Sequence, residues 1–310
     1  MIISASRRTD IPAFFSDWFY NNLGRGYFLV RNPMNIHQIS QINISPSTVD
    51  CFVFWTKNPE PFLRRIKELN GYKYYFQYTV TGYGRSLEPN VPSMESTIQT
   101  FISLSKSIGP KRVIWRYDPI LLSNKFDMEF HVSNFTNIAG KLSGHTKRCV
   151  ISFVDFYKKT IRNLSGIDYD DISQYQIDAL VKNLSEIARS HNIELVTCAE
   201  DIDLRRYNVN QGKCIDEKLI EEFTGFSLKI KKDANQRQEC GCAASIDIGA
   251  YNTCPHSCLY CYANFDLRQV RENYEQHDEH SGLLFGSVGS KDTIRQRKML
   301  SCKNIQQKLL

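Results

Sequence analysis

The sequence predicts an α/β protein built on a parallel β-sheet. Short apolar runs rich in β-branched and aromatic residues alternate with stretches in which apolar residues recur every three or four positions. Because the strand-like runs are apolar throughout, we expect parallel pairing, with helices covering the sheet. The chain has 310 residues, of which 42% are hydrophobic and 23% charged, so it can bury a large core.

Seven apolar runs are expected as strands. They cover residues 2–5, 51–55, 74–80, 112–115, 149–154, 193–197 and 244–248. Among the intervening stretches, residues 98–108 and 177–188 place their apolar side chains on one face of a helix. Alternating strands and helices of this kind form either an open sheet or a barrel.

Polar residues follow the first five of these strands directly. They are residues 6–10, 56–58, 79–82, 116–118 and Asp155. The carboxyl ends of parallel strands share one edge of the sheet, and ligands of β/α proteins bind there. Each cluster alone could equally be a turn or a helix cap. Five of them in register predict a substrate or cofactor pocket.

The basic charge is concentrated at the end of the chain. The net charge is +6, but residues 291–310 contain six basic residues and one acidic residue. The body of the chain is nearly neutral, which does not favour a nucleic-acid partner. Residues 229–238 are expected as a linker and residues 276–310 as a loop with a solvated basic tail. No stretch approaches the ~18 apolar residues of a membrane span, so we expect a cytoplasmic protein without membrane contact.

Ten cysteines in such a protein indicate metal binding more than disulfides. Cys51 and Cys149 open apolar runs and are expected in the core. Cys254, Cys258 and Cys261 fall within eight residues, so their thiolates should converge on one centre. They could bind three irons of a four-iron cluster and leave the fourth iron open. The alternative is structural zinc, with His256 or the pair Cys240 and Cys242 completing four ligands.

The Cys-x3-Cys-x2-Cys spacing, with Tyr260 before the last cysteine, resembles the cluster loop of radical S-adenosylmethionine (SAM) enzymes. The resemblance implies a partial, TIM-like β/α barrel, a 4Fe-4S cluster, and reductive cleavage of SAM to a 5′-deoxyadenosyl radical. It also implies an electron donor such as flavodoxin or ferredoxin. In that superfamily the loop follows the first strand, whereas here it lies after some 240 residues, so the barrel is expected to be circularly permuted. Residues 1–275 would form it, with 229–275 as the cysteine-rich segment.

The polar residues at the strand ends extend the resemblance. Residues 56–59, 77–82 and 116–120 are similar, in that order, to strand ends of the spore photoproduct lyase-like branch of radical SAM enzymes. The resemblance implies that Tyr260 packs near the adenine of SAM. The other candidates for holding SAM are Lys57, Gln77, Thr79, Thr81, Arg116 and Asp118. The Gly-Gly-Glu motif that often binds the amino group of SAM is absent from the sequence.

Segments spread over the whole chain resemble an uncharacterised bacterial family known as domain of unknown function DUF1848. They are residues 4–12, 54–59, 247–249 and 261–264. The family is described as carrying a C-terminal cysteine cluster similar to the N-terminal one of radical SAM enzymes. The resemblance therefore supports the cluster and leaves the substrate and reaction open. The alternative function is a non-catalytic protein stabilised by zinc or an iron–sulfur cluster.

Four further cysteines could form a second metal site, iron–sulfur or zinc. They are Cys198, Cys214, Cys240 and Cys242. Reduced thiols without metal are an equally acceptable interpretation. Carboxylates at Glu200, Asp201 and Asp203 could accept hydrogen bonds from a ribose or a cationic substrate, although a solvated turn or a helix cap is favoured. The basic side chains Arg7, Arg8, Lys57 and Arg116 could neutralise an anion at the same edge.

Overall fold

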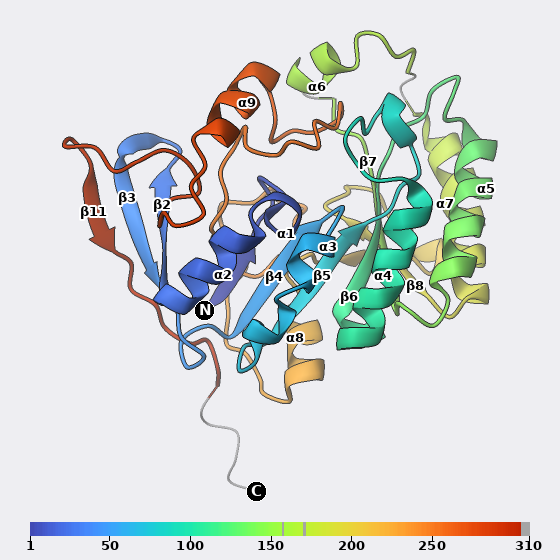
Figure 1. The fold of residues 1–310 in the computed structure, drawn as a ribbon. Helices are drawn as coiled ribbons and strands as arrows, with labels where there is room; N and C mark the ends of the chain where they lie inside the picture. The colour runs from blue at the N-terminus through green and yellow to red at the C-terminus, as the bar shows by residue number, and fades with distance from the viewer. Residues whose placement is uncertain (157, 170–171, 305–310) are drawn as a thin grey trace, which may run out of the picture.

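The computed structural model describes residues 1–156, 158–169 and 172–304. Its centre is an eight-stranded sheet with the order β10-β1-β4-β5-β6-β7-β8-β9, in which every neighbouring pair is parallel (Figure 1). The strands are β1 (Ile2–Ala5), β4 (Cys51–Thr56), β5 (Tyr74–Thr79), β6 (Val113–Ile120), β7 (Arg148–Phe153), β8 (Glu194–Cys198), β9 (Asn210–Gly212) and β10 (Ile246–Asp247). The predicted α/β class is confirmed, and each of the seven predicted runs overlaps a strand of this sheet.

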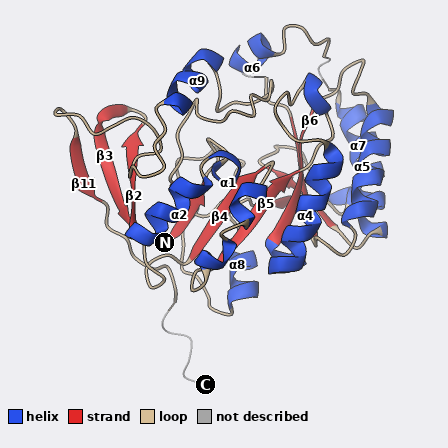
Figure 2. Cartoon of the chain, in the orientation of Figure 1, coloured by secondary structure: helices blue, strands red, loops and turns tan. Residues whose placement is uncertain are grey.

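The helices differ in length and in how they begin. They are α1 (Ile11–Phe14), α2 (Ser16–Arg25), α3 (Glu60–Leu63), α4 (Met94–Ile108), α5 (Met128–Leu142), α6 (Lys158–Asn163), α7 (Gln174–Ser190), α8 (Glu217–Thr224) and α9 (Leu267–Glu275) (Figure 2). Four short 3-10 helices also occur, at Ile66–Leu69, Gly84–Ser86, Pro110–Arg112 and Arg205–Tyr207. Polar side chains cap most of the long helices, and α7 begins with a capping box of Ser173 and Gln176. The two predicted amphipathic stretches lie in α4 and α7.

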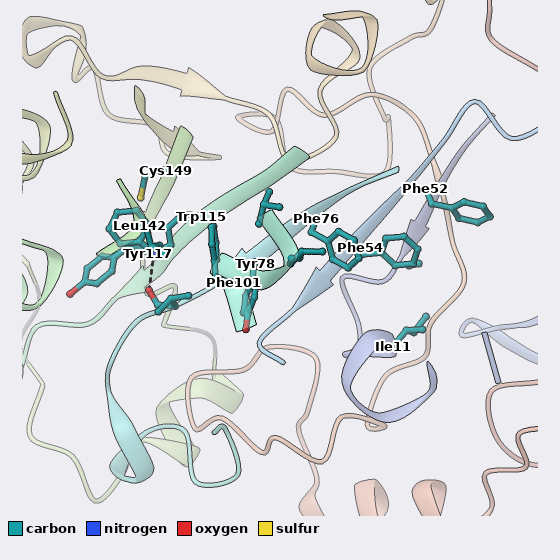
Figure 3. Close-up of a cluster of buried hydrophobic side chains, with 14 of the residues drawn as sticks. Ile11, Phe52, Phe54, Phe76, Tyr78, Phe101, Trp115, Tyr117, Leu142 and Cys149 are labelled. Atoms are coloured by element: carbon teal, nitrogen blue, oxygen red, sulfur yellow. Dashed lines mark hydrogen bonds between the residues drawn. The ribbon is translucent and has the colours of Figure 1, made fainter. Parts of the chain in front are cut away.

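Successive strand residues point to opposite faces of the sheet, and both faces are buried. Phe52, Phe54 and Trp115 belong to the larger core (Figure 3), which also contains residues of helices α2, α4, α5 and α7. Their neighbours Cys51 and Val53 belong to a smaller cluster with Ile2, Tyr75, Ile114, Val150, Val196 and residues of α8. This alternation explains why the strands read as continuous apolar runs. Cys51 and Cys149 are fully buried in the core, as predicted.

The strand ladder has β10 at one edge and β9 at the other, and no strand pairing joins these edges in the described parts of the chain. The architecture that the pairing establishes is therefore a parallel sheet. The two edges nevertheless approach each other, because the Ala243 N–H donates to the Ile215 carbonyl at 3.0 Å. Ala243 precedes β10 and Ile215 follows β9.

A second, three-stranded sheet lies beside the first (Figure 1). It consists of β2 (Tyr27–Asn32), β3 (Asn35–Asn43) and β11 (Thr293–Gln296), and β11 pairs in parallel with β3. Part of the segment 276–310, expected as loop and tail, is therefore a strand. Its four side chains are all exposed, so no apolar alternation marks it in the sequence. None of the helices described is long and apolar enough to cross a bilayer.

Candidate functional site

A cavity of about 430 Å³ lies at the carboxyl edge of the large sheet, where the sequence predicts a pocket. Residues that belong to or follow β1, β4, β5, β6, β7, β8 and β10 contribute to its wall. Seven cysteines line it: Cys198, Cys214, Cys240, Cys242, Cys254, Cys258 and Cys261. The structure thus brings both predicted cysteine groups to one cavity, although they come from four separate segments of the chain.

The cysteine loop, residues 254–261, follows β10 and is held by backbone contacts. The Leu259 N–H donates to the Leu87 carbonyl at 2.9 Å, and the Asn264 side chain donates to the Cys254 carbonyl at 2.6 Å. Ser257 adopts a left-handed φ of 56°, which turns the chain between the first two cysteines. The loop leads into α9, which begins at Leu267 and is capped by the side chain of Asp266.

Burial raises the pKa of each of the three loop thiols, Cys254, Cys258 and Cys261. Thiols with raised pKa values stay protonated unless a metal or another cation stabilises the thiolate. In the described residues no three His, Cys, Asp or Glu side chains already surround a common metal position. The loop presents three soft sulfur donors to the cavity, and this donor set fits a thiolate-bound metal centre.

His256 lies within the loop but is bound elsewhere. Its Nε2 is 3.0 Å from Asp10 Oδ2 and its Nδ1 is 3.2 Å from the Asn90 carbonyl oxygen. The ring is buried and packs edge-on against Phe14, with centroids 4.6 Å apart. Both ring nitrogens therefore face oxygen acceptors, so His256 in this arrangement neither completes a zinc site nor faces solvent.

Asp10 connects the loop to the segments that follow β1 and β4. Its carboxylate caps α1 by accepting from the Ala13 N–H at 3.0 Å and accepts from the Lys57 N–H at 2.7 Å, besides holding His256. Replacing Asp10 with alanine should lower the free energy of unfolding by about 2–4 kcal/mol, because a cap and two buried hydrogen bonds are lost. Denaturant unfolding of the purified variant measures this loss.

Asp127→Ala is the matched control for that variant, because exposed Asp127 caps α5 through one bond to the Phe130 N–H at 2.8 Å. It should cost about 1 kcal/mol. Equal losses in the two variants would show that Asp10 acts as a helix cap alone.

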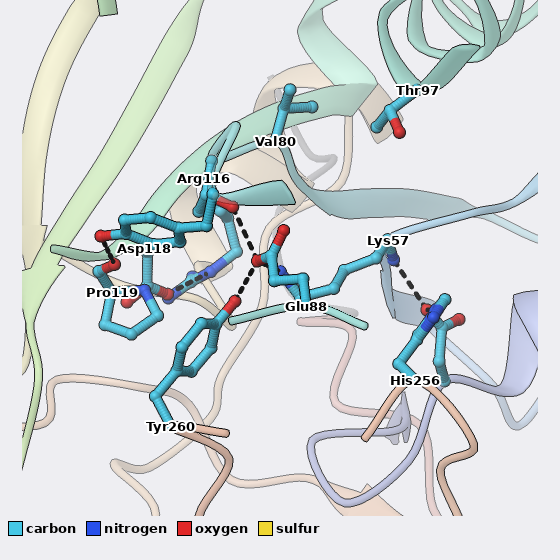
Figure 4. Close-up of polar contacts among 12 residues, drawn as sticks. Lys57, Val80, Glu88, Thr97, Arg116, Asp118, Pro119, His256 and Tyr260 are labelled. Atoms are coloured by element: carbon cyan, nitrogen blue, oxygen red, sulfur yellow. Dashed lines mark hydrogen bonds and ion pairs between the residues drawn. The ribbon is translucent and has the colours of Figure 1, made fainter. Parts of the chain in front are cut away.

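Lys57, Glu88 and Tyr260 form a polar group around the buried carboxylate of Glu88, beside the loop (Figure 4). The Lys57 ammonium contacts Glu88 Oε1 at 2.7 Å, and the same oxygen accepts from the hydroxyls of Thr81, at 2.7 Å, and Tyr260. Burial acts to raise the pKa of Glu88, but Lys57 and the hydrogen bonds outweigh it and lower that pKa. Tyr260 is thereby fixed against the cavity. Glu88 was not predicted, because a single glutamate in a loop carries no motif.

Arg116 and Asp118 form a second polar group on the cavity wall. The Arg116 Nε donates to Asp118 at 2.8 Å, and Ser152 donates to the other carboxylate oxygen. Gln77 stands behind this pair, where it accepts from Arg116 at 3.2 Å and donates to the Cys214 carbonyl at 2.9 Å. Burial acts to lower the pKa of Arg116, but Asp118 and nearby thiols outweigh it and raise that pKa.

The structure separates the residues that the resemblance assigns to SAM binding into two sets. Lys57, Thr79, Arg116, Asp118 and Tyr260 line the cavity. Gln77 and Thr81 do not, because both are buried and their side chains hold other residues of the site, Arg116 and Glu88 respectively. Gln77 and Thr81 therefore support Arg116 and Glu88 from behind the cavity wall.

Arg7 and Arg8 also line the cavity. Arg7 lies over the Trp55 ring at 5.3 Å and Arg8 over the Tyr251 ring at 4.9 Å. Asp247, at the end of β10, stabilises this part of the cavity wall. Its carboxylate accepts from the Arg7 N–H at 3.0 Å and from the hydroxyls of Ser4 and Ser6. A side chain at Gly249 would overlap Ser6, which explains the glycine.

The predicted carboxylate group at residues 200–203 does not reach the cavity wall. Glu200 accepts from the Phe153 N–H at 2.9 Å, and burial raises its pKa to about 7. Asp203 is exposed and pairs with Arg205 at 2.6 Å. These contacts indicate structural roles for Glu200 and Asp203.

The comparisons with known proteins give one match. The model of a family described as domain of unknown function, DUF1848, matches residues 2–263, which include both sheet edges and the whole cysteine loop. No curated protein and no solved structure matches the chain. The matched segment covers most of the 310 residues. The chain therefore belongs to the DUF1848 family.

Proposed function

We propose that the chain is a radical SAM enzyme in which Cys254, Cys258 and Cys261 bind a four-iron cluster. One observation carries the proposal: three thiols of a single loop line a cavity at the carboxyl edge of a parallel sheet. The loop's histidine is held by Asp10 and Asn90, so the loop supplies three ligands rather than four. A cluster with three protein ligands keeps one iron open for SAM, and together they supply one-electron cleavage of SAM and hydrogen-atom abstraction.

The order of strands in space supports a permuted relationship to radical SAM enzymes. β10 stands at one edge of the sheet, next to β1, and the remaining strands follow in chain order from there. The cysteine loop therefore follows the first strand in spatial order, although it lies near the end of the chain. Strands pair by position and not by chain order, so such a rearrangement preserves a site built on strand ends.

The residues of the cavity wall would bind and orient SAM and the substrate. Glu88, which is paired with Lys57, accepts from the Tyr260 hydroxyl, so the ring has a fixed orientation for packing against an adenine. The paired Arg116 and Asp118 offer a guanidinium and a carboxylate to polar groups of the ligands. Trp55, Phe153 and Tyr262 add aromatic surface that would exclude water from the reacting atoms.

Electron paramagnetic resonance of anaerobically purified, dithionite-reduced protein tests this proposal. Wild-type protein is expected to contain about four irons and four sulfides per chain in this cluster and to give a reduced-cluster signal that changes when SAM is added. The Cys254→Ala/Cys258→Ala/Cys261→Ala variant should lose both the signal and this iron. Cys302→Ala, which removes a thiol outside the cavity, should keep them. A signal indifferent to SAM, or zinc in place of iron at the loop, would contradict the proposal.

A further inference from the structure

A second group of thiols lies in the same cavity and is separate from the cysteine loop. It consists of Cys198, Cys214, Cys240 and Cys242, here called the cysteine quartet. The sulfurs of Cys198 and Cys214 are 3.0 Å apart, and Cys242 interacts through its side chain with both Cys214 and Cys240. Cys214, Cys240 and Cys242 are each more than nine-tenths buried. Four neighbouring thiols, three of them buried, are not explained by hydrophobic packing alone.

The quartet stands where the two edges of the large sheet approach each other. Cys198 ends β8 and Cys214 follows β9, whereas Cys240 and Cys242 precede β10. The Ile215 N–H points to the Cys242 sulfur at 3.5 Å, next to the backbone bond from Ala243 to Ile215. The four thiols therefore lie between two edges of the sheet that no strand ladder connects among the residues described.

Two guanidinium groups accompany the quartet. Arg116 donates from Nη1 to the Cys214 sulfur at 2.9 Å. Arg7 interacts electrostatically with Cys242 and Cys214, and its buried Nη2 has no hydrogen-bond partner among the described residues. A buried donor without a partner is costly unless a ligand or ion satisfies it. Two cations beside four sulfurs fit a centre with negative charge, such as a metal bound by four thiolates.

We propose that the cysteine quartet binds one zinc ion in tetrahedral coordination and that this ion clamps the two edges of the sheet together. With Zn–S bonds of ~2.3 Å, the ligand sulfurs of such a site lie about 3.8 Å apart. The sulfurs of Cys198 and Cys214 are 3.0 Å apart, so they would have to move apart slightly to bind zinc. A four-iron cluster would require the sulfurs to move farther apart, because each cysteine then binds a different iron.

Zinc binding here changes no oxidation state. Each of the four thiols loses one proton to solvent and forms one Zn–S bond, so the site carries two negative charges beside Arg7 and Arg116. A disulfide between Cys198 and Cys214 would instead require a two-electron oxidant, for which the structure provides no source.

Metal analysis of the full chain, purified anaerobically without added zinc, tests the proposal. Wild-type protein and the Cys254→Ala/Cys258→Ala/Cys261→Ala variant are both expected to hold about one zinc per chain. Cys198→Ser/Cys242→Ser should lose at least about nine-tenths of it, and the control Cys302→Ser should retain it. Circular dichroism verifies that each variant is folded. Retention of zinc by the loop variant separates this site from the proposed function, which that variant abolishes.

A second measurement needs no substitution. Titration of wild-type protein with a mercurial reagent should release zinc in step with the modification of four thiols, and a cobalt-exchanged sample should show the visible bands of tetrahedral thiolate coordination. The proposal is overturned if the loop variant holds no zinc, if the quartet variant keeps its zinc, or if the second metal is iron accompanied by sulfide. A disulfide between Cys198 and Cys214 in metal-free protein, found by mass spectrometry, would also overturn it.

Discussion

Replacing Glu88 with glutamine is expected to lower the free energy of unfolding by about 3–5 kcal/mol at neutral pH. The substitution keeps the shape of the side chain and an oxygen that accepts from Thr81 and Tyr260. It removes the negative charge that balances the Lys57 ammonium, whose side chain is 14% exposed. The loss therefore comes from a buried charge that has lost its partner. Urea unfolding followed by circular dichroism measures it.

The effect of Glu88→Gln should depend on pH in one direction. The pKa of Glu88 is lowered in the folded protein, so its stabilising contribution is present above its ordinary pKa of 4.5 and is lost as the pH falls through the lower, folded value. Wild type and variant should therefore differ most near pH 7 and converge in acid below pH 4.5. A difference that grows on acidification would contradict this assignment.

Two variants isolate the ion pair between Lys57 and Glu88. Glu95→Gln breaks the exposed pair with Lys141, which has the same 2.7 Å separation, and should change stability little. The double variant Lys57→Met/Glu88→Gln removes both charges and should recover most of the stability lost in Glu88→Gln alone. A double variant as unstable as the single one would show that the pair is not the cause.

Replacing Trp115 with alanine should cost about 3–5 kcal/mol of unfolding free energy. Trp115 lies on β6, is fully buried, and stacks on Phe135 of α5 with ring centroids 4.6 Å apart. Its indole N–H donates to the Val80 carbonyl at 3.0 Å. The substitution therefore opens a large cavity between the sheet and α5 and leaves a carbonyl unpaired. Thermal and urea unfolding both report the loss.

The controls for Trp115→Ala separate packing from hydrogen bonding. Trp115→Phe keeps an aromatic ring against Phe135 and should cost markedly less than alanine. Tyr175→Ala removes an aromatic side chain that is 82% exposed and should change stability by less than about 0.5 kcal/mol. If Trp115→Ala were as mild as Tyr175→Ala, the packing of α5 on the sheet would be wrong.

The strands of the large sheet were predictable because burial on both faces leaves a strong signal. Residues 51–55 are apolar at every position, and the structure places neighbouring side chains in two different buried clusters. β9 and β11 were not predicted, because all their residues except Ile294 are polar or glycine and their positions depend on backbone pairing. Such strands are determined by long-range contacts that a local pattern does not contain.

The candidate site was predictable where a motif gathers residues within a short segment. The spacing of Cys254, Cys258 and Cys261 identifies the loop, and the structure places all three on one cavity. Contacts across the chain were not predictable, such as His256 with Asp10, 246 positions apart, or Tyr260 with Glu88, 172 positions apart. Asp10 and Glu88 contact the loop from segments that precede it by many residues, so the local spacing of the loop does not reveal them.

We propose that the cysteine loop supports the reductive cleavage of SAM. The most direct measurement is chromatographic detection of 5′-deoxyadenosine and methionine after the anaerobic, reconstituted protein is incubated with SAM and dithionite. The wild-type chain is expected to form both products in equal amounts, and Cys258→Ser is expected to form neither while remaining folded. A protein that holds a four-iron cluster yet leaves SAM intact, or a Cys258→Ser variant that still forms both products, would contradict the account.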